Sequence, residues 1–133
     1  PPAMYEDFVK VSEPINGVNP DFPFVVTERK GEPGPKPVTA GGSDHAHFVM
    51  NGVPAIGLTL GDPKGYDFNY NEIWHTERDL YNKSIPEYQE HASTVTAIMM
   101  YGLGNLDHLP NRKGLYKEYI TGNERISATR QST

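Results

Sequence analysis

The residues best suited to chemistry lie in segment 74–79, where a histidine follows the only tryptophan of the chain. The neutral imidazole of His75 is a common zinc ligand, and such a ligand usually needs an acceptor for its other ring N–H. Asp79, four residues later, could supply that acceptor or cap the following turn. A structural zinc ion takes about four protein ligands. His75 is therefore a candidate ligand but not a complete site.

A second cluster reads Gly-Gly-Ser-Asp-His-Ala-His-Phe over residues 41–48. The side chain of Ser43 or Asp44 could cap a short helix over 44–51, a role that needs no active site. His45 and His47 are too close to Asp44 in sequence to complete a metal site without distortion. We interpret these two histidines as solvent-exposed.

Aromatic residues precede His75. Tyr70 belongs to an aromatic run over 66–70, and Trp74 presents a large apolar face with only an indole N–H to donate. These side chains could line a substrate pocket, or the loop could fold back over its own aromatic rings. Neither Glu72 nor Glu77 is assigned as a general base.

Composition limits the classes of function. The chain has 133 residues, enough for one domain. Its net charge of −5 argues against nucleic-acid binding, which needs a basic surface. No apolar run approaches the roughly 20 residues that span a bilayer. Without cysteine there is neither a disulfide framework nor thiolate chemistry.

The elements that must position these residues follow from periodicity and turn signals. Apolar spacing predicts helices over 3–12 and 85–103, the second with a capping box of Ser84 and Glu87. Segments 22–27 and 54–60 are predicted to be strands, the latter buried. An apolar patch is predicted to dock as a turn or short helix, and it consists of Leu115, Tyr116, Tyr119 and Ile120.

The two clusters together resemble the C-terminal half of the M28 family of zinc-dependent aminopeptidases and related exopeptidases. That family reads roughly Gly-Gly-Ser-Asp-His-x-x-Phe, a short helix, Gly-(Val/Ile)-Pro-Ala, a loop, then an aromatic residue, His-Thr-x-x-Asp and a final helix. Here the three motifs are matched by residues 41–48, 52–55 and 74–79. The likeness runs from about Gly41 to Leu103.

This resemblance implies an α/β three-layer zinc-exopeptidase fold, present as its C-terminal portion only, with the last strands and a long packing helix. Residues 1–121 would be the C-terminal part of the peptidase domain, and 122–133 a polar, poorly ordered tail. A secreted or periplasmic location follows from the family tendency alone.

The resemblance also implies roles. Two zinc ions about 3.5–4 Å apart would use His75 as one ligand, with the other ligands and the catalytic Glu in an upstream half of the same domain. Asp44 would take part in catalysis, Trp74 and Tyr70 would bind the peptide substrate, and Asp79 would support His75. The chain would then be an aminopeptidase fragment, inactive alone.

Two other functions stay open. Many family aminopeptidases carry Tyr where this chain has Trp74, and the related glutaminyl cyclases, which share the fold, read Trp-His-Thr. A cyclase that closes an N-terminal glutamine is thus one alternative. A non-catalytic binding ectodomain that kept this scaffold and lost its metals is the other.

Overall fold

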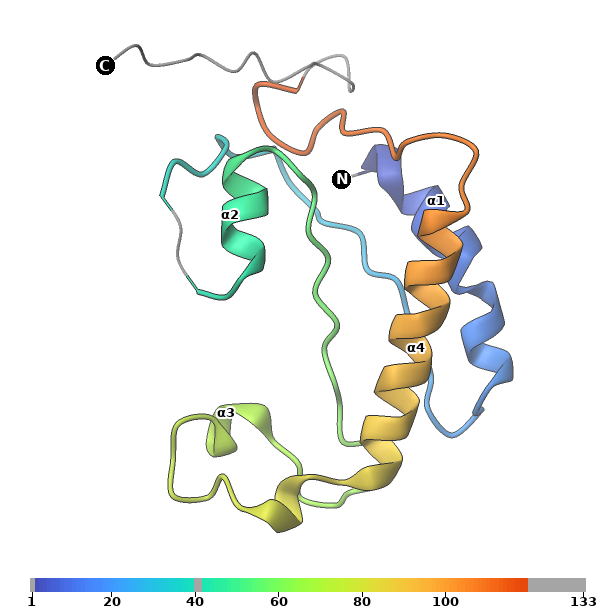
Figure 1. Ribbon diagram of the computed structural model, residues 1–133, viewed down its shortest axis with the longest axis vertical. Coiled ribbons are helices and arrows are strands. Elements are labelled where there is room, and N and C mark those ends of the chain that lie inside the picture. The colour runs from blue at the N-terminus through green and yellow to red at the C-terminus, as the bar shows by residue number, and fades with distance from the viewer. Residues whose placement is uncertain (1, 40–41, 120–133) are drawn as a thin grey trace. The chain divides into compact units, whose positions relative to one another are not determined.

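A computed structural model describes residues 2–39 and 42–119, and within these ranges the protein is built from helices, turns and coil (Figure 1). The helical elements are α1 (Pro2–Ser12), the 3-10 helix η1 (Glu13–Gly17), α2 (His45–Met50), α3 (Tyr70–Ile73), the 3-10 helix η2 (Tyr81–Lys83) and α4 (Pro86–Gly104). The described residues contain no strand. The expected α/β three-layer fold with its last strands is therefore wrong.

The two predicted strands fail for one physical reason. A strand is stable only when its N–H and C=O groups pair with a neighbour, and neither segment 22–27 nor 54–60 forms such a ladder among the described residues. The predicted burial of 54–60 fails with it, because Ile56, Leu58 and Leu60 are 47%, 42% and 44% exposed. Figure 1 draws this stretch as a continuous coil without an arrow.

The chain divides into two compact units. Among the described residues the first unit comprises 2–7, 27–57 without the gap at 40–41, and 108–119. The second unit comprises 8–26 and 58–107. Each unit has its own buried residues and is described separately.

The core of the second unit lies between the end of α1, η1 and one face of α4. Its buried members are Val11, Ile15, Val95 and Met99, of which Ile15 is fully buried. Partly buried apolar residues surround them, namely Phe8, Phe24, Ile98, Leu103 and Leu106. Helical spacing on α1 and α4 predicted these faces, and both helices are confirmed to within two residues.

The predicted capping box of α4 does not form. The N-cap residue is Ile85, which makes no side-chain cap. Ser84 instead accepts a hydrogen bond from the side-chain amide of Gln89, and Glu87 pairs with Lys64 at 2.7 Å. Both side chains that would have capped the helix thus have competing partners. Pro86 in the first turn reduces the need for a cap because it has no N–H to satisfy.

The first unit contains α2, which is confirmed close to its predicted bounds. Gly52 follows it with φ +73, a left-handed conformation that terminates helices and suits glycine. Lys36 Nζ donates to the carbonyl of Met50 at 2.6 Å, which satisfies an end of the helix.

The predicted C-terminal patch docks in the same unit. Tyr116 and Tyr119 are 8% and 6% exposed, their rings lie 5.6 Å apart, and the backbone between them is a turn. Ile120 and the predicted tail 122–133 lie outside the described residues. Among the helices of the described residues, none combines the length and the apolar character needed to cross a bilayer.

Candidate functional site

His75 occupies the turn that directly follows α3, in the second unit. Its backbone has φ +57, the left-handed region in which histidine is uncommon but more frequent than most non-glycine residues. Its side chain is exposed, and its ring lies 4.3 Å from that of Trp74. A strained backbone conformation persists only where surrounding contacts enforce it, and such conformations cluster at functional sites.

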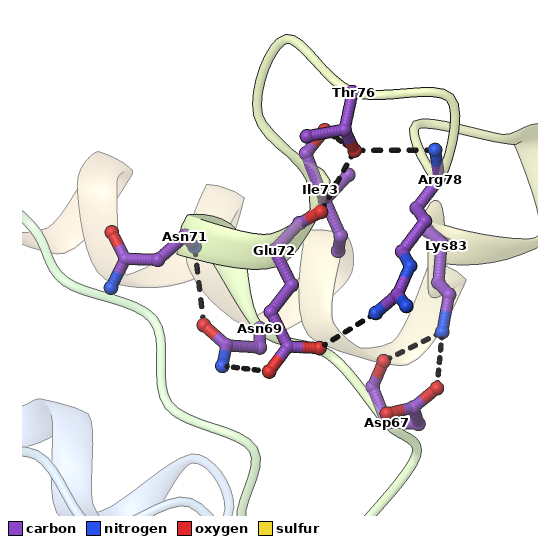
Figure 2. Close-up of polar contacts among 8 residues, drawn as sticks. All are labelled: Asp67, Asn69, Asn71, Glu72, Ile73, Thr76, Arg78 and Lys83. Atoms are coloured by element: carbon purple, nitrogen blue, oxygen red, sulfur yellow. Dashed lines mark hydrogen bonds and ion pairs between the residues drawn. The ribbon is translucent and has the colours of Figure 1, made fainter.

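The surroundings that enforce this turn begin with the cap of α3 (Figure 2). Asn69 stands at the N-cap, where its side-chain oxygen accepts the Asn71 N–H at 3.1 Å. Its amide group also donates to Glu72 Oε1 at 2.9 Å. Sequence analysis missed α3, although Asn followed three residues later by Glu is a recognised start signal for a helix.

The other end of α3 is held by Thr76. Its hydroxyl lies 2.8 Å from the carbonyl oxygen of Glu72 and 2.9 Å from that of Ile73, so it satisfies the end of the helix. The same hydroxyl accepts the Arg78 N–H at 3.2 Å, and the Arg78 guanidinium pairs with Glu72 at 3.4 Å (Figure 2). These contacts on both sides fix the backbone of His75.

A second left-handed residue, Asp67, anchors the loop before α3. Its φ is +57, and both its carboxylate and its carbonyl oxygen accept from Lys83 Nζ, at 2.6 and 2.8 Å (Figure 2). The Lys83 side chain is 20% exposed, whereas that of Asp67 is 84% exposed. The pair ties the loop to η2.

The start of the same loop is fixed by Asp62. Its carboxylate accepts the N–H groups of Tyr66 and Phe68 at 2.9 and 3.1 Å and the hydroxyl of Tyr88 at 2.5 Å. Tyr88 comes from α4, is 4% exposed, and accepts the Lys64 N–H at 3.0 Å. The Tyr88 hydroxyl is the main cause that lowers the pKa of Asp62, and burial followed by this hydrogen bond raises the pKa of Tyr88.

These shifts predict how Tyr88→Phe changes the pH dependence of stability. A lowered carboxyl pKa stabilises the fold above the ordinary value of about 3.9, and this stabilisation is lost as the pH falls below it. The Tyr88 phenol, with its raised pKa, stabilises the fold below its ordinary value of about 10. This stabilisation is lost as the pH rises above that value. We expect Tyr88→Phe to lower the free energy of unfolding between about pH 5 and 9, with the deficit shrinking below pH 4.

Urea denaturation at several pH values measures this deficit. Tyr66→Phe is the matched control, because the Tyr66 hydroxyl donates to Glu87 at 3.3 Å in an exposed position. The control should change stability little at any pH. A Tyr88→Phe deficit of the same size at pH 3 and pH 7 would contradict the role of the Asp62 carboxylate.

A cleft of about 370 Å³ opens beside α3 in the second unit. Its apolar and aromatic walls consist of Phe68, Tyr70, Ile73, Trp74, Leu80 and Tyr81. Its polar lining consists of Asp79, Lys83, Ser84 and Gln89. Tyr70 and Trp74 stack with ring centroids 6.0 Å apart and planes within 18°, and both stay more than half exposed. An aromatic surface of this kind can bind an apolar or cationic ligand group.

The structure thus brings three of the predicted site residues together, since Tyr70, Trp74 and Asp79 all line the cleft. His75 does not line it, although its ring contacts that of Trp74. Among the contacts of the described residues there is none between the Asp79 carboxylate and the His75 ring, so the supporting role of Asp79 stays a prediction. Lys83 was not predicted, because its pairing with Asp67 depends on how the loop folds.

Asp44 lies in the first unit, immediately before α2. Its side chain is exposed and makes no cap hydrogen bond, so the alternative reading of Asp44 as a helix cap finds no support. Its catalytic role stays a prediction. His45 and His47 are exposed, as interpreted from the sequence.

The donor set does not fit a zinc ion on its own. Within residues 2–39 and 42–119, no group of three or more His, Cys, Asp and Glu side chains could hold a metal ion. His75 has an aromatic neighbour in Trp74, and no carboxylate contacts its ring among the described residues. Among the described residues, His75 therefore presents an exposed imidazole without further ligands beside it rather than a metal centre.

Comparison with known proteins places the chain in a family. The sequence profile of peptidase family M28 matches residues 17–99, which is more than half of the chain. The chain belongs to peptidase family M28, and the resemblance noted from the sequence is confirmed. Searches of curated proteins and of solved structures return no match. Membership indicates a hydrolase that acts on peptides.

Proposed function

We propose that this chain is part of a zinc-dependent aminopeptidase that removes residues from the N-terminus of peptides. The observation that carries the proposal is the family match over residues 17–99. That range contains Asp44, Trp74 and His75, and therefore both motifs from which the site was predicted. The zinc requirement and the exopeptidase specificity are features of the proposal.

In this proposal His75 provides one zinc ligand, and the remaining ligands come from residues outside this chain. The support is local: contacts on both sides of the turn hold His75 exposed in a strained backbone conformation. Trp74 and Tyr70 would bind the substrate through the aromatic face that they expose in the cleft. Asp44 would join the catalytic hydrogen-bond network. Location outside the cytoplasm, secreted or periplasmic, belongs to the same proposal.

The reaction class can be tested with two substrates on a polypeptide that contains this chain together with the remaining ligands. We expect release of nitroaniline from aminoacyl-nitroanilides and no cyclisation of glutaminyl peptides. The reverse result would favour the cyclase, for which the apolar face of Trp74 in a small cleft is the supporting observation. Absence of both activities, together with absence of bound zinc, would favour a binding protein. Either of these results would overturn the proposed aminopeptidase.

A further inference from the structure

The charges in the cleft are unevenly balanced. Among the residues that the structure describes, Asp79 is the only acidic one that lines the cleft, and Lys83 is the only basic one. Among the contacts of the described residues, the Asp79 carboxylate has neither an ion pair nor a hydrogen bond, whereas its backbone N–H donates to Thr76 at 3.2 Å. An exposed carboxylate in this position is available to a ligand.

The charge of Lys83 is already compensated. Its ammonium contacts the carboxylate of Asp67 at 2.6 Å and the carbonyl oxygen of Asp67 at 2.8 Å, which uses two of its three protons. Asp67 is not itself part of the lining. Of the charged groups that the described residues place in the cleft, that of Asp79 is the uncompensated one.

The aromatic wall complements this charge. Trp74 and Tyr70 stack and stay 57% and 59% exposed, and Tyr81 is 94% exposed. The faces of such rings carry negative electrostatic potential and attract ammonium and guanidinium groups, most strongly at tryptophan. The net charge of −5 also favours the approach of cationic ligands.

We propose that this cleft, lined by Trp74, Tyr70 and Asp79, binds an organic cation of a peptide, an ammonium or guanidinium group, between the aromatic faces and the carboxylate. This inference rests on the proposed function, because it names the substrate class of the same site. The side chain of lysine or arginine is the expected source of the cation. The α-ammonium group of a peptide is the second source with the same chemistry.

Binding can be followed without catalysis, because Trp74 is the only tryptophan of the chain and reports directly on the cleft. The 133-residue chain is titrated with acetyl-lysinamide, with the neutral analogue acetyl-norleucinamide and with leucinamide. We expect acetyl-lysinamide to change the Trp74 fluorescence and to bind about tenfold more tightly than acetyl-norleucinamide. Binding of leucinamide alone would assign the cleft to the α-ammonium group. Equal affinity for the charged and neutral ligands would overturn the proposal.

Three variants test the assignment of charges. Asp79→Asn should weaken binding of acetyl-lysinamide about threefold to fivefold. Glu77→Gln is the control and should not weaken binding, because Glu77 is an exposed residue outside the lining, two positions away. Asp67→Asn leaves the Lys83 charge uncompensated and should also weaken binding. Asparagine tolerates the left-handed backbone of position 67, so this variant keeps the loop. Equal effects of Asp79→Asn and Glu77→Gln would mean that only the overall charge matters, and would overturn the site.

The outcomes for the two proposals are separable. Cation binding requires only the cleft in the second unit and no metal. A chain that binds acetyl-lysinamide as expected, in a protein that fails to hydrolyse any nitroanilide, would retain this inference and reject the aminopeptidase. Hydrolysis with no preference for basic residues, together with no ligand effect on Trp74 fluorescence, would retain the aminopeptidase and reject the cation-binding cleft.

Discussion

Replacing His75 with alanine in an active form of the enzyme is expected to lower kcat/KM by at least about 100-fold, because even residues that only support a metal ligand cost about 10–100-fold when they are removed. The same variant should bind less zinc by metal analysis. Glu77→Gln, a neighbouring exposed substitution, is the control and should leave both quantities unchanged. Unchanged zinc content and turnover in His75→Ala would refute the proposed role of this histidine.

The backbone of His75 adds a second measurement that separates function from stability. At φ +57 an alanine pays the steric cost of the left-handed region, about 1–2 kcal/mol, whereas glycine does not. Both variants lack the imidazole and should be equally inactive. His75→Gly should nevertheless be more stable than His75→Ala by about 1 kcal/mol. This difference is smaller than the full steric cost because glycine makes the unfolded chain more flexible. Equal stability would mean that the turn is not held in this conformation.

The structure brings together that part of the predicted site whose residues are close in the sequence. Tyr70, Trp74 and Asp79 are separated by four and five residues, and a short helix with its following turn brings them to one cleft. The left-handed backbone of His75 has no signature in the sequence, since it depends on Thr76 closing the end of α3. Whether Asp44 joins this site depends on contacts between distant parts of the chain, which local patterns do not encode.

The same distinction explains the fold. Helices satisfy their backbone groups internally, so the apolar spacing of α1 and α4 was sufficient to predict them. Strands depend on a partner from elsewhere, and the apolar run 54–60 has none among the described residues. The pattern of that run was read correctly as apolar but wrongly as buried. Ser84 and Glu87 failed as a capping box because tertiary partners competed for their side chains.

The close contact of α4 with the end of α1 gives the largest expected effect on stability. A methyl group added at Gly102 would lie 2.6 Å from Val11 Cβ, closer than Cβ atoms approach other atoms, and 3.1 Å from Val11 Cγ1, which is a tight contact. Val11 is buried in the core of the second unit beside Ile15 and Met99. Gly102→Ala should therefore lower the free energy of unfolding by about 1–2 kcal/mol, because overpacking of about 1–3 kcal/mol exceeds the helix propensity that alanine gains.

Gly104, two residues later in the same helix, provides the matched control. A methyl group at this position meets nothing within 4 Å, so Gly104→Ala adds helix propensity without a clash. It should raise the free energy of unfolding by up to about 0.5–1 kcal/mol, less at the fraying end of the helix. In urea denaturation the free energies of unfolding of the two variants should shift in opposite directions from that of the unchanged protein. The two values should differ by about 2 kcal/mol. If both alanines stabilise the protein, α1 and α4 are not packed as closely as Val11 and Gly102 require. The core of the second unit would then have a different arrangement.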